Sequence, residues 1–356
     1  MTFSAADFRF DARTSFLNYR AMTSTNILRR VFFFLISMLS MLAAPVLRAE
    51  VNQVEKIAPE IYFHEGEIKG KGHCNNGWII FDDYVLVVDA NFPSGARVIL
   101  PKIKELTDKP IRFAFDTHHH GDHAYGNQFW VEQGAVPVAH TGVLEEMAKY
   151  EPTRWNDTAR SRADMGGTKL KPPTLLYQTE MFFDDGKHRA ELRHFGVAHT
   201  HGDGFVWLPK EKILFTGDAC VNGAFNYLAD GDTGQWIQTL ENAKKLGAKI
   251  VCPGHGPRGD AQLLDDQQKY FVELRAAVKK YADKKPEEVK AAGDEIKKSL
   301  EQQERIKKFV PASILAHVEK VYVEMGGQPF PKTAAVIDAR KLHLIAHGGS
   351  AEDAGR

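Results

Sequence analysis

The segment DTHHHGDH, residues 116 to 123, constrains this chain more than any other part of its sequence. It holds four histidines and two aspartates, directly after the alternating apolar residues of PIRFAF. Imidazole nitrogens and carboxylate oxygens suit Zn²⁺, and also iron or manganese, and they rarely gather at this density for packing. The sequence therefore predicts a metal-binding loop at the end of a strand, in a fold that brings further ligands to it.

Three later segments supply such ligands. ELRHFGVAHTHGD, KILFTGDAC and AKIVCPGHG each pass from a predicted strand to a residue that can bind a metal, and these residues are His199, Asp218 and His255. Neighbouring residues of a loop can face opposite ways, so one loop can serve two metals. We expect a first site of His118, His120 and His199, a second site of Asp122, His123 and His255, and Asp218 as a bridge between them.

Two divalent ions that share a water lower its pKa to about 7, and the resulting hydroxide can attack a carbonyl carbon. Asp122 is expected to act in catalysis as the ligand that positions this nucleophilic water. The predicted cofactor is a pair of Zn²⁺ ions, with iron or manganese as the alternatives. The predicted partner is a small-molecule substrate.

HHHGDH fits the pattern His-x-His-x-Asp-His, and His199, Asp218 and His255 follow it in order. In these residues the chain resembles the metallo-β-lactamase superfamily, over roughly residues 55 to 258. The resemblance implies a four-layer αββα sandwich, an α/β fold with the metals at one edge. The branch with a cysteine ligand has Cys at the position of Asp218, whereas the superfamily's thioesterases and lactonases have Asp there.

The same resemblance also suggests which residues contact the substrate. The segment NYLAD resembles the NLAD loop of the lactamases, with Asn226 displaced by one position and Tyr227 in the matching place. Val221 stands where those enzymes carry a lysine for the drug's carboxylate, so Val221→Lys is expected to improve binding of β-lactams. His201, Asn226 and Tyr227 are the candidate substrate-binding residues. Asp116 is a candidate partner that orients a ligand histidine, and His119 is expected to point away from the metals.

The expected function is a periplasmic dinuclear zinc hydrolase that acts on a lactam, a lactone or another small ester or amide. One alternative is an accessory metal-binding protein of a periplasmic redox or sulfur-oxidation pathway. The other is an iron-dependent oxidoreductase that resembles persulfide dioxygenases. Those oxidoreductases do not need His123 and His255 as ligands, so the presence of both residues counts against that alternative.

The predicted domain order begins with a signal peptide over residues 1–49. Arg29 and Arg30 precede the apolar run VFFFLISMLSMLAAPVL, and Met22 is a plausible true start. We expect a metallo-β-lactamase-like domain over 50–260, a helical extension over 261–330 and a weakly ordered tail over 331–356. The protein is then periplasmic or secreted, without stable membrane association after the signal is cleaved.

Composition excludes some partners. Lys and Arg together number 46, as do Asp and Glu, so no net positive charge favours nucleic acid. The three cysteines are too few and too far apart for a disulfide framework. The helical extension is expected to serve as a cap or lid support, or to form an oligomer.

Local patterns predict four elements in detail. Asp82 and Asp83 break two apolar runs and predict a hairpin. Ser94 is predicted to cap a helix that runs to about Leu106. QWIQTLENAKKLG predicts a helix that ends at Gly247. Apolar residues from Pro286 to about Leu300 predict one continuous helix.

Overall fold

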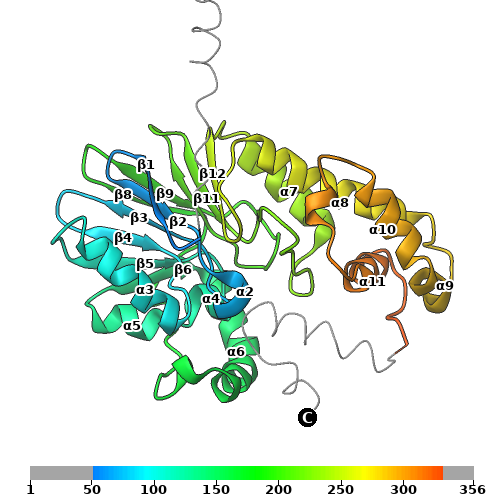
Figure 1. The fold of residues 1–356 in the computed structure, drawn as a ribbon, viewed down its shortest axis with the longest axis horizontal. Helices are drawn as coiled ribbons and strands as arrows, with labels where there is room; N and C mark the ends of the chain where they lie inside the picture. Colours follow the sequence, from blue (N-terminus) through cyan, green and yellow to red (C-terminus); the bar gives the residue numbers. More distant parts are fainter. Residues whose placement is uncertain (1–50, 332–356) are drawn as a thin grey trace, which may run out of the picture. The chain divides into compact units, whose positions relative to one another are not determined.

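The computed structural model describes residues 51–331 of the chain, all within one compact unit, Ala49–Arg356. The predicted signal peptide lies outside the described residues, and so does the predicted tail except for Pro331. Two β-sheets form the centre of the molecule (Figure 1).

The first sheet has seven strands in chain order. These are β1 (Val54–Ala58), β2 (Ile61–His64), β3 (Asn76–Ile80), β4 (Val85–Val88), β5 (Ile111–Asp116), β6 (Val136–His140) and β7 (Leu175–Tyr177). Strands β1 to β4 pair antiparallel, and β4 to β7 pair parallel. The predicted hairpin at Asp82 and Asp83 is confirmed as the turn between β3 and β4.

The second sheet has five strands, in the order β12-β11-β10-β9-β8. Their bounds are β8 (Glu180–Asp184), β9 (Arg189–Arg193), β10 (Phe205–Leu208), β11 (Ile213–Gly217) and β12 (Ile250–Pro253). Only β11 and β12 pair parallel. Because α7 (Thr233–Lys244) connects these two, their carboxyl ends meet at one edge of the sheet.

Side chains alternate across the strands and build three layers of core. Ile79 on β3 and Phe215 on β11 lie in one buried cluster between the two sheets. The neighbours of Ile79, Trp78 and Ile80, face the other way and pack with Ile99 of α3 (Pro93–Lys104). Helices thus cover the outer face of each sheet, and the predicted αββα sandwich is confirmed.

The remaining helices of this region are short or lie at the edge of the first sheet. They are α2 (Ile68–Lys71), α4 (Gly121–Ala124), α5 (Asn127–Glu132), α6 (Thr141–Ser161) and the 3₁₀ turn η1 (Ala163–Met165). The prediction that Ser94 caps α3 is wrong, because Phe92 is the cap and Pro93 opens the first turn. Helix α7 ends at Lys244, three residues before the left-handed Gly247.

The C-terminal helices are α8 (Gln262–Lys279), α9 (Pro286–Ala291), α10 (Gly293–Glu301), the 3₁₀ turn η2 (Lys307–Phe309) and α11 (Leu315–Glu324). The single helix predicted from Pro286 is wrong, because the structure divides it at Ala292. A Cβ atom at Gly293 would lie 2.6 Å from the Leu315 side chain, so the absence of a side chain at this position lets α11 pack closely. These helices share one buried cluster with α7 and the second sheet.

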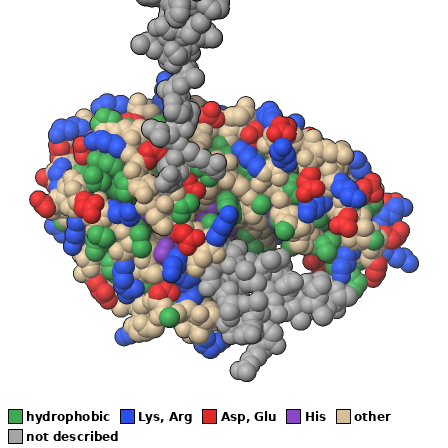
Figure 2. Space-filling view, in the orientation of Figure 1, with side chains coloured by type: hydrophobic (Ala, Val, Ile, Leu, Met, Phe, Trp, Pro, Cys, Tyr) green, Lys and Arg blue, Asp and Glu red, His purple; other side chains and the backbone are tan. Residues whose placement is uncertain are grey.

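Figure 2 shows basic and acidic side chains interspersed over the face in view, in line with the balanced composition. Within residues 51–331, no helix combines the length and the apolar character needed to cross a lipid bilayer.

Candidate metal centre

The seven predicted ligands come together at one edge of the two sheets. His118 and His120 follow β5, and Asp122 and His123 lie in the single turn of α4. His199 lies in the loop between β9 and β10, Asp218 directly follows β11, and His255 follows β12. Each of the seven side chains is at most 4% exposed. Gly254 permits this convergence, because a Cβ atom there would lie 2.0 Å from Asp218 Oδ1.

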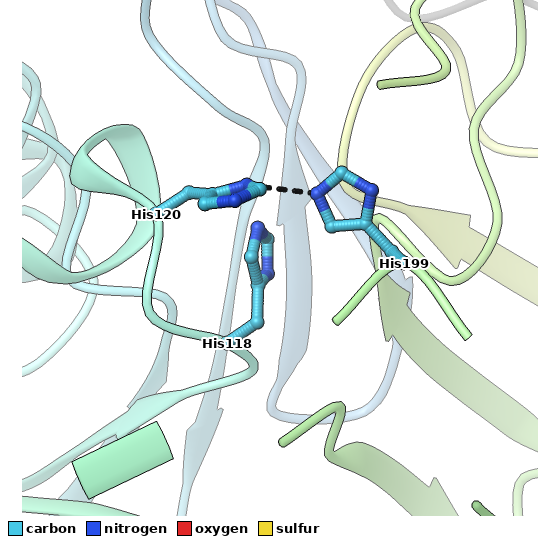
Figure 3. Close-up of side chains that lie close together, drawn as sticks. All are labelled: His118, His120 and His199. Carbon is cyan, nitrogen blue, oxygen red and sulfur yellow. Dashed lines mark hydrogen bonds between the residues drawn. The ribbon is translucent and has the colours of Figure 1, made fainter. Parts of the chain in front are cut away.

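The first predicted site is a compact group of three imidazole rings. The ring centroids of His118, His120 and His199 lie 4.6 to 4.8 Å apart. His120 Nδ1 and His199 Nε2 are 2.8 Å apart, and Figure 3 shows the three rings converging on one point. His118 Nε2 is buried and has no hydrogen-bond partner among the described residues. Nitrogen atoms directed at a common point are what a metal ion requires.

The second predicted site lies beside the first. Asp122 Oδ2 is 3.1 Å from His255 Nε2 and 3.4 Å from His123 Nε2. The two histidine nitrogens are 3.5 Å apart. These three residues present ligand atoms within 4.8 Å of one another, as do His118, His120 and His199.

Asp218 contacts both groups. Its Oδ1 lies 3.4 Å from His123 Nε2, and its Oδ2 lies 3.3 Å from His255 Nε2. The same Oδ2 is 3.6 Å from His199 Nε2 in the first group. A carboxylate between two sets of imidazoles has the position that a bridging ligand needs.

Two aspartates outside the predicted set fix the ligand rings from behind. Asp89, directly after β4, lies with Oδ2 3.0 Å from His123 Nδ1. His120 Nε2 donates to Asp230 Oδ2 at 2.8 Å. Such contacts fix the tautomer and the orientation of a ligand histidine. Sequence reasoning missed both residues, although Asp89 carries the same signal as Asp218, an aspartate at a strand end.

Asp230 is held in turn by helix α6. Arg154 donates to both of its oxygens, at 2.6 and 2.9 Å. The Asp230 carboxylate, although buried, is thus paired and keeps its charge, because hydrogen bonds from His120 and Arg154 outweigh burial and hold its pKa well below the usual range. His119 lies on the far side of the loop, with Nδ1 3.2 Å from Glu146 Oε2 and its ring stacked on Tyr150.

The charge states of the histidines differ between the two groups. Burial lowers the pKa of His199 to about 4, and it also lowers the pKa values of His118 and His120, so their nitrogens carry free electron pairs at neutral pH. Burial would raise the pKa of Asp218, but His255 and His123 outweigh burial and keep the carboxylate ionised. Burial would lower the pKa of His255, but Asp218 and Asp122 raise it to about 9. Burial would also lower the pKa of His123, but Asp122, Asp89 and Asp218 raise it well above its usual value. The first group therefore offers neutral imidazoles, the form that binds zinc, whereas both histidines of the second group hold a proton that a metal ion would have to displace.

The candidate substrate residues are placed differently from one another. The Tyr227 ring lies 5.6 Å from the His120 ring and 6.4 Å from the His199 ring. The Asn226 side chain is turned towards α8, where its Oδ1 accepts a hydrogen bond from Gln267 at 2.6 Å. The His201 residue is exposed, and its backbone N–H donates a hydrogen bond to Glu146 at 3.2 Å. Asp116 accepts a hydrogen bond from Asn127 at 2.6 Å instead of one from a ligand histidine.

Glu151 gives this region a pH-dependent stability. Burial raises the pKa of its carboxyl group to about 8 from 4.5, with Arg154 opposing the shift and Asp230 adding to it. The folded state therefore keeps a proton that the unfolded chain loses above about pH 4.5. The contribution of Glu151 to stability is therefore full below that pH and is lost as the pH rises towards 8.

We expect Glu151→Gln to stabilise the protein by about 3 kcal/mol at pH 7 and to have little effect below pH 4.5, since glutamine resembles the protonated acid. Urea unfolding at several pH values measures the difference. Glu145→Gln, an exposed position on the same helix, is the matched control. Equal pH profiles for wild type and Glu151→Gln would contradict the prediction.

Comparison with known proteins agrees with this fold. The curated metallo-beta-lactamase type 2 of Bacillus cereus is 25% identical over 221 residues, which is 59% of this chain and 79% of the relative. The enzyme of the same description from Pseudomonas aeruginosa is 22% identical over 226 residues, covering 60% of this chain and 81% of the relative. The solved metallo-beta-lactamase from Pontibacter korlensis superposes with a TM-score of 0.53 at 22% identity, covering 62% of this chain and 98% of that one.

The family profile gives the assignment. The profile described as the metallo-beta-lactamase superfamily matches residues 70–255, more than half of the 356 residues and a range that contains all seven predicted ligands. The two sheets flanked by helices have the layout of the solved structure. This chain therefore belongs to the metallo-beta-lactamase superfamily.

Proposed function

We propose that the protein is a dinuclear zinc hydrolase that attacks the carbonyl group of a lactam, a lactone or another small ester or amide. The position of Asp218 carries the proposal, because its carboxylate touches histidines of both groups. A single-metal site would not need ligand-type residues on both sides of this carboxylate. The complete second group of Asp122, His123 and His255 also argues against an iron-dependent oxidoreductase, which can do without it.

The residues have distinct roles in this proposal. His118, His120 and His199 would hold the first cation, Asp122, His123 and His255 would hold the second, and Asp218 lies between the two groups. Two such cations would lower the pKa of a shared water and polarise the substrate carbonyl. Asp122 orients that water, while Asp89 and Asp230 keep the rings of His123 and His120 in place. Burial of all these side chains excludes bulk water and strengthens each electrostatic contact.

On the substrate side, the proposal assigns the main contact to Tyr227. Its ring lies against two ligand histidines of the first group and is partly exposed, so it can meet a bound substrate. The Asn226 amide is engaged by Gln267 and is less suited to polarise a carbonyl. His201 remains a candidate only for contacts at the exposed rim of the site. The compartment proposed for the enzyme is the periplasm, on the strength of the basic and apolar N-terminal sequence.

The first test is metal content. We expect about two zinc ions per chain in metal-replete protein, and about one in a His255→Ala variant, because the second group then loses one of its imidazoles. Plasma emission spectroscopy measures both. His188→Ala, which removes a histidine that pairs with Glu211 at the turn between β8 and β9, is the matched control. A wild-type protein that holds one metal even in excess zinc would contradict the dinuclear proposal.

The second test is turnover. A panel of nitrocefin, lactones and thioesters, assayed with zinc-loaded protein, should reveal at least one hydrolysed class. Loss of that activity on chelation, and its return with added zinc, would support a metal-dependent hydrolase. Absence of turnover with the whole panel, despite two bound zinc ions, would favour the accessory metal-binding alternative.

A further inference from the structure

The segment from Asn222 to Asp232, between β11 and α7, is called the site loop here. It carries Tyr227, whose ring lies 5.6 Å from the His120 ring, and Asp230, which accepts the hydrogen bond of His120 Nε2. The loop has no regular secondary structure of its own. Its position at the metal centre must therefore come from contacts with other elements.

Helix α11 supplies two of these contacts, and a third to the first residue of α7, from one face. His317 Nε2 donates to the Asn226 carbonyl oxygen at 3.0 Å, and Lys320 Nζ donates to the Ala229 carbonyl at 3.4 Å. Glu324 accepts the backbone N–H of Thr233 at 3.0 Å. Residues 317, 320 and 324 follow at intervals of three and four, which places them on the same side of a helix. The polar stripe of α11 thus runs along the site loop from Asn226 to the start of α7.

Helix α8 supports the same stripe from behind. Tyr270 O–H lies 2.6 Å from His317 Nδ1, and Gln267 Nε2 donates to Asn226 Oδ1 at 2.6 Å. Arg275 donates to Glu324 at 2.8 Å. Because His317 Nε2 donates to a carbonyl, Nδ1 is the acceptor for Tyr270, and both ring nitrogens have a partner that fixes the neutral tautomer. The His317 side chain is buried.

We propose that the C-terminal helices α8 and α11 position the site loop, and that His317 is the positioning residue that couples them to the first metal site. The coupling runs from His317 to the Asn226 carbonyl, along the loop to Asp230, and from Asp230 to His120. The inference rests on the proposed role of His120 as a ligand. It assigns to the extension a function inside the active centre, in place of the cap or oligomer element that its sequence suggests.

The extent of the family similarity fits this assignment. The superfamily profile ends at residue 255, before α8 begins at Gln262. The polar stripe of α11 and its partners on α8 therefore lie outside the part of the chain that matches the family. The site loop lies inside that part, so a segment within the family match and helices outside it meet at Asn226.

Zinc affinity tests the proposal. Metal-free full-length protein is titrated with Zn²⁺ in competition with a chromogenic chelator, and the visible absorption of Co²⁺-loaded protein is recorded. We expect His317→Ala to weaken binding of the first zinc about tenfold, as the loss of an orienting contact does, and to change the Co²⁺ spectrum. His317→Gln can still donate to the Asn226 carbonyl, so its zinc affinity and Co²⁺ spectrum should stay as in wild type.

Ile296→Val separates positioning from stability. Ile296 on α10 is buried in the apolar cluster that also holds Val318 and Val321 of α11, and it makes no hydrogen bond to the site loop. This variant should lower the thermal midpoint and leave zinc affinity and the Co²⁺ spectrum as in wild type. If His317→Ala does not yield folded protein, Tyr270→Phe decides, because it removes one oxygen and should weaken the first zinc about threefold.

The outcomes are distinct. A His317→Ala variant with wild-type zinc affinity and Co²⁺ spectrum, or such a Tyr270→Phe variant in its place, would overturn this inference alone. An Ile296→Val variant that loses zinc affinity as His317→Ala does would also overturn it, since any loss of stability would then suffice. A wild-type protein that binds no zinc would overturn the proposed function together with the inference.

Discussion

Asp218→Ala is expected to reduce hydrolysis by about 100-fold or more while the protein stays folded. The carboxylate contacts histidines of both groups. Without it, two cations would face each other across a gap with one negative charge fewer, and their repulsion would no longer be offset. The nucleophilic water would also lose a fixed position between them.

Two measurements test this effect together. One is turnover of a panel substrate that the wild type hydrolyses, and the other is metal content by plasma emission spectroscopy. We expect the variant to hold fewer than two zinc ions at concentrations that saturate wild type. Asp82→Ala, at the exposed turn between β3 and β4, is the matched control and should keep both metals and full turnover. An Asp218→Ala variant with wild-type turnover and two zinc ions would show that Asp218 does not bridge.

The fold and the convergence of the seven predicted residues could be predicted from the sequence, because the motif that carries the family resemblance is local. The four residues from His118 to His123 that face the centre lie within one short loop, and the other three each follow a run of strand-forming residues. Parallel strands bring the residues that follow them to one edge of the sheet, whatever the length of the segments that connect the strands. The alternation of apolar residues likewise determined which side of each strand entered the core.

The partners of the ligands were less predictable, because their signals are not local. Asp230 is an ordinary loop aspartate until the fold brings it to Arg154, which lies 76 residues away in the chain. Helix–loop contacts such as that of His317 with Asn226 span 91 residues and use a residue type without a pattern of its own. The resemblance to the lactamase loop singled out Asn226 and Tyr227 together, but it could not tell which side chain faces the histidines.

Val221 shows how a position can mislead when only the sequence is read. It was expected that Val221→Lys would improve β-lactam binding, since lysine binds the drug's carboxylate at the matching position of related enzymes. In the structure Val221 is 0% exposed and belongs to the buried cluster that includes Leu264 and Phe271. Its side chain therefore lies in the core beneath the site loop, where a substrate carboxylate does not reach. The burial of Val221 therefore argues against the expected gain in β-lactam binding.

We instead expect Val221→Lys to destabilise the protein by about 3–5 kcal/mol, because it places an ammonium group in an apolar core without a partner. Urea unfolding of zinc-loaded protein measures the loss. Val221→Met is the matched control, since methionine has a similar unbranched length without the charge, and overpacking alone should cost about 1–3 kcal/mol. Nitrocefin turnover by Val221→Lys should not exceed that of wild type. A variant with wild-type stability and faster nitrocefin turnover would mean that the lysine reaches the metal centre, and that the site loop moves far enough to open the core at Val221.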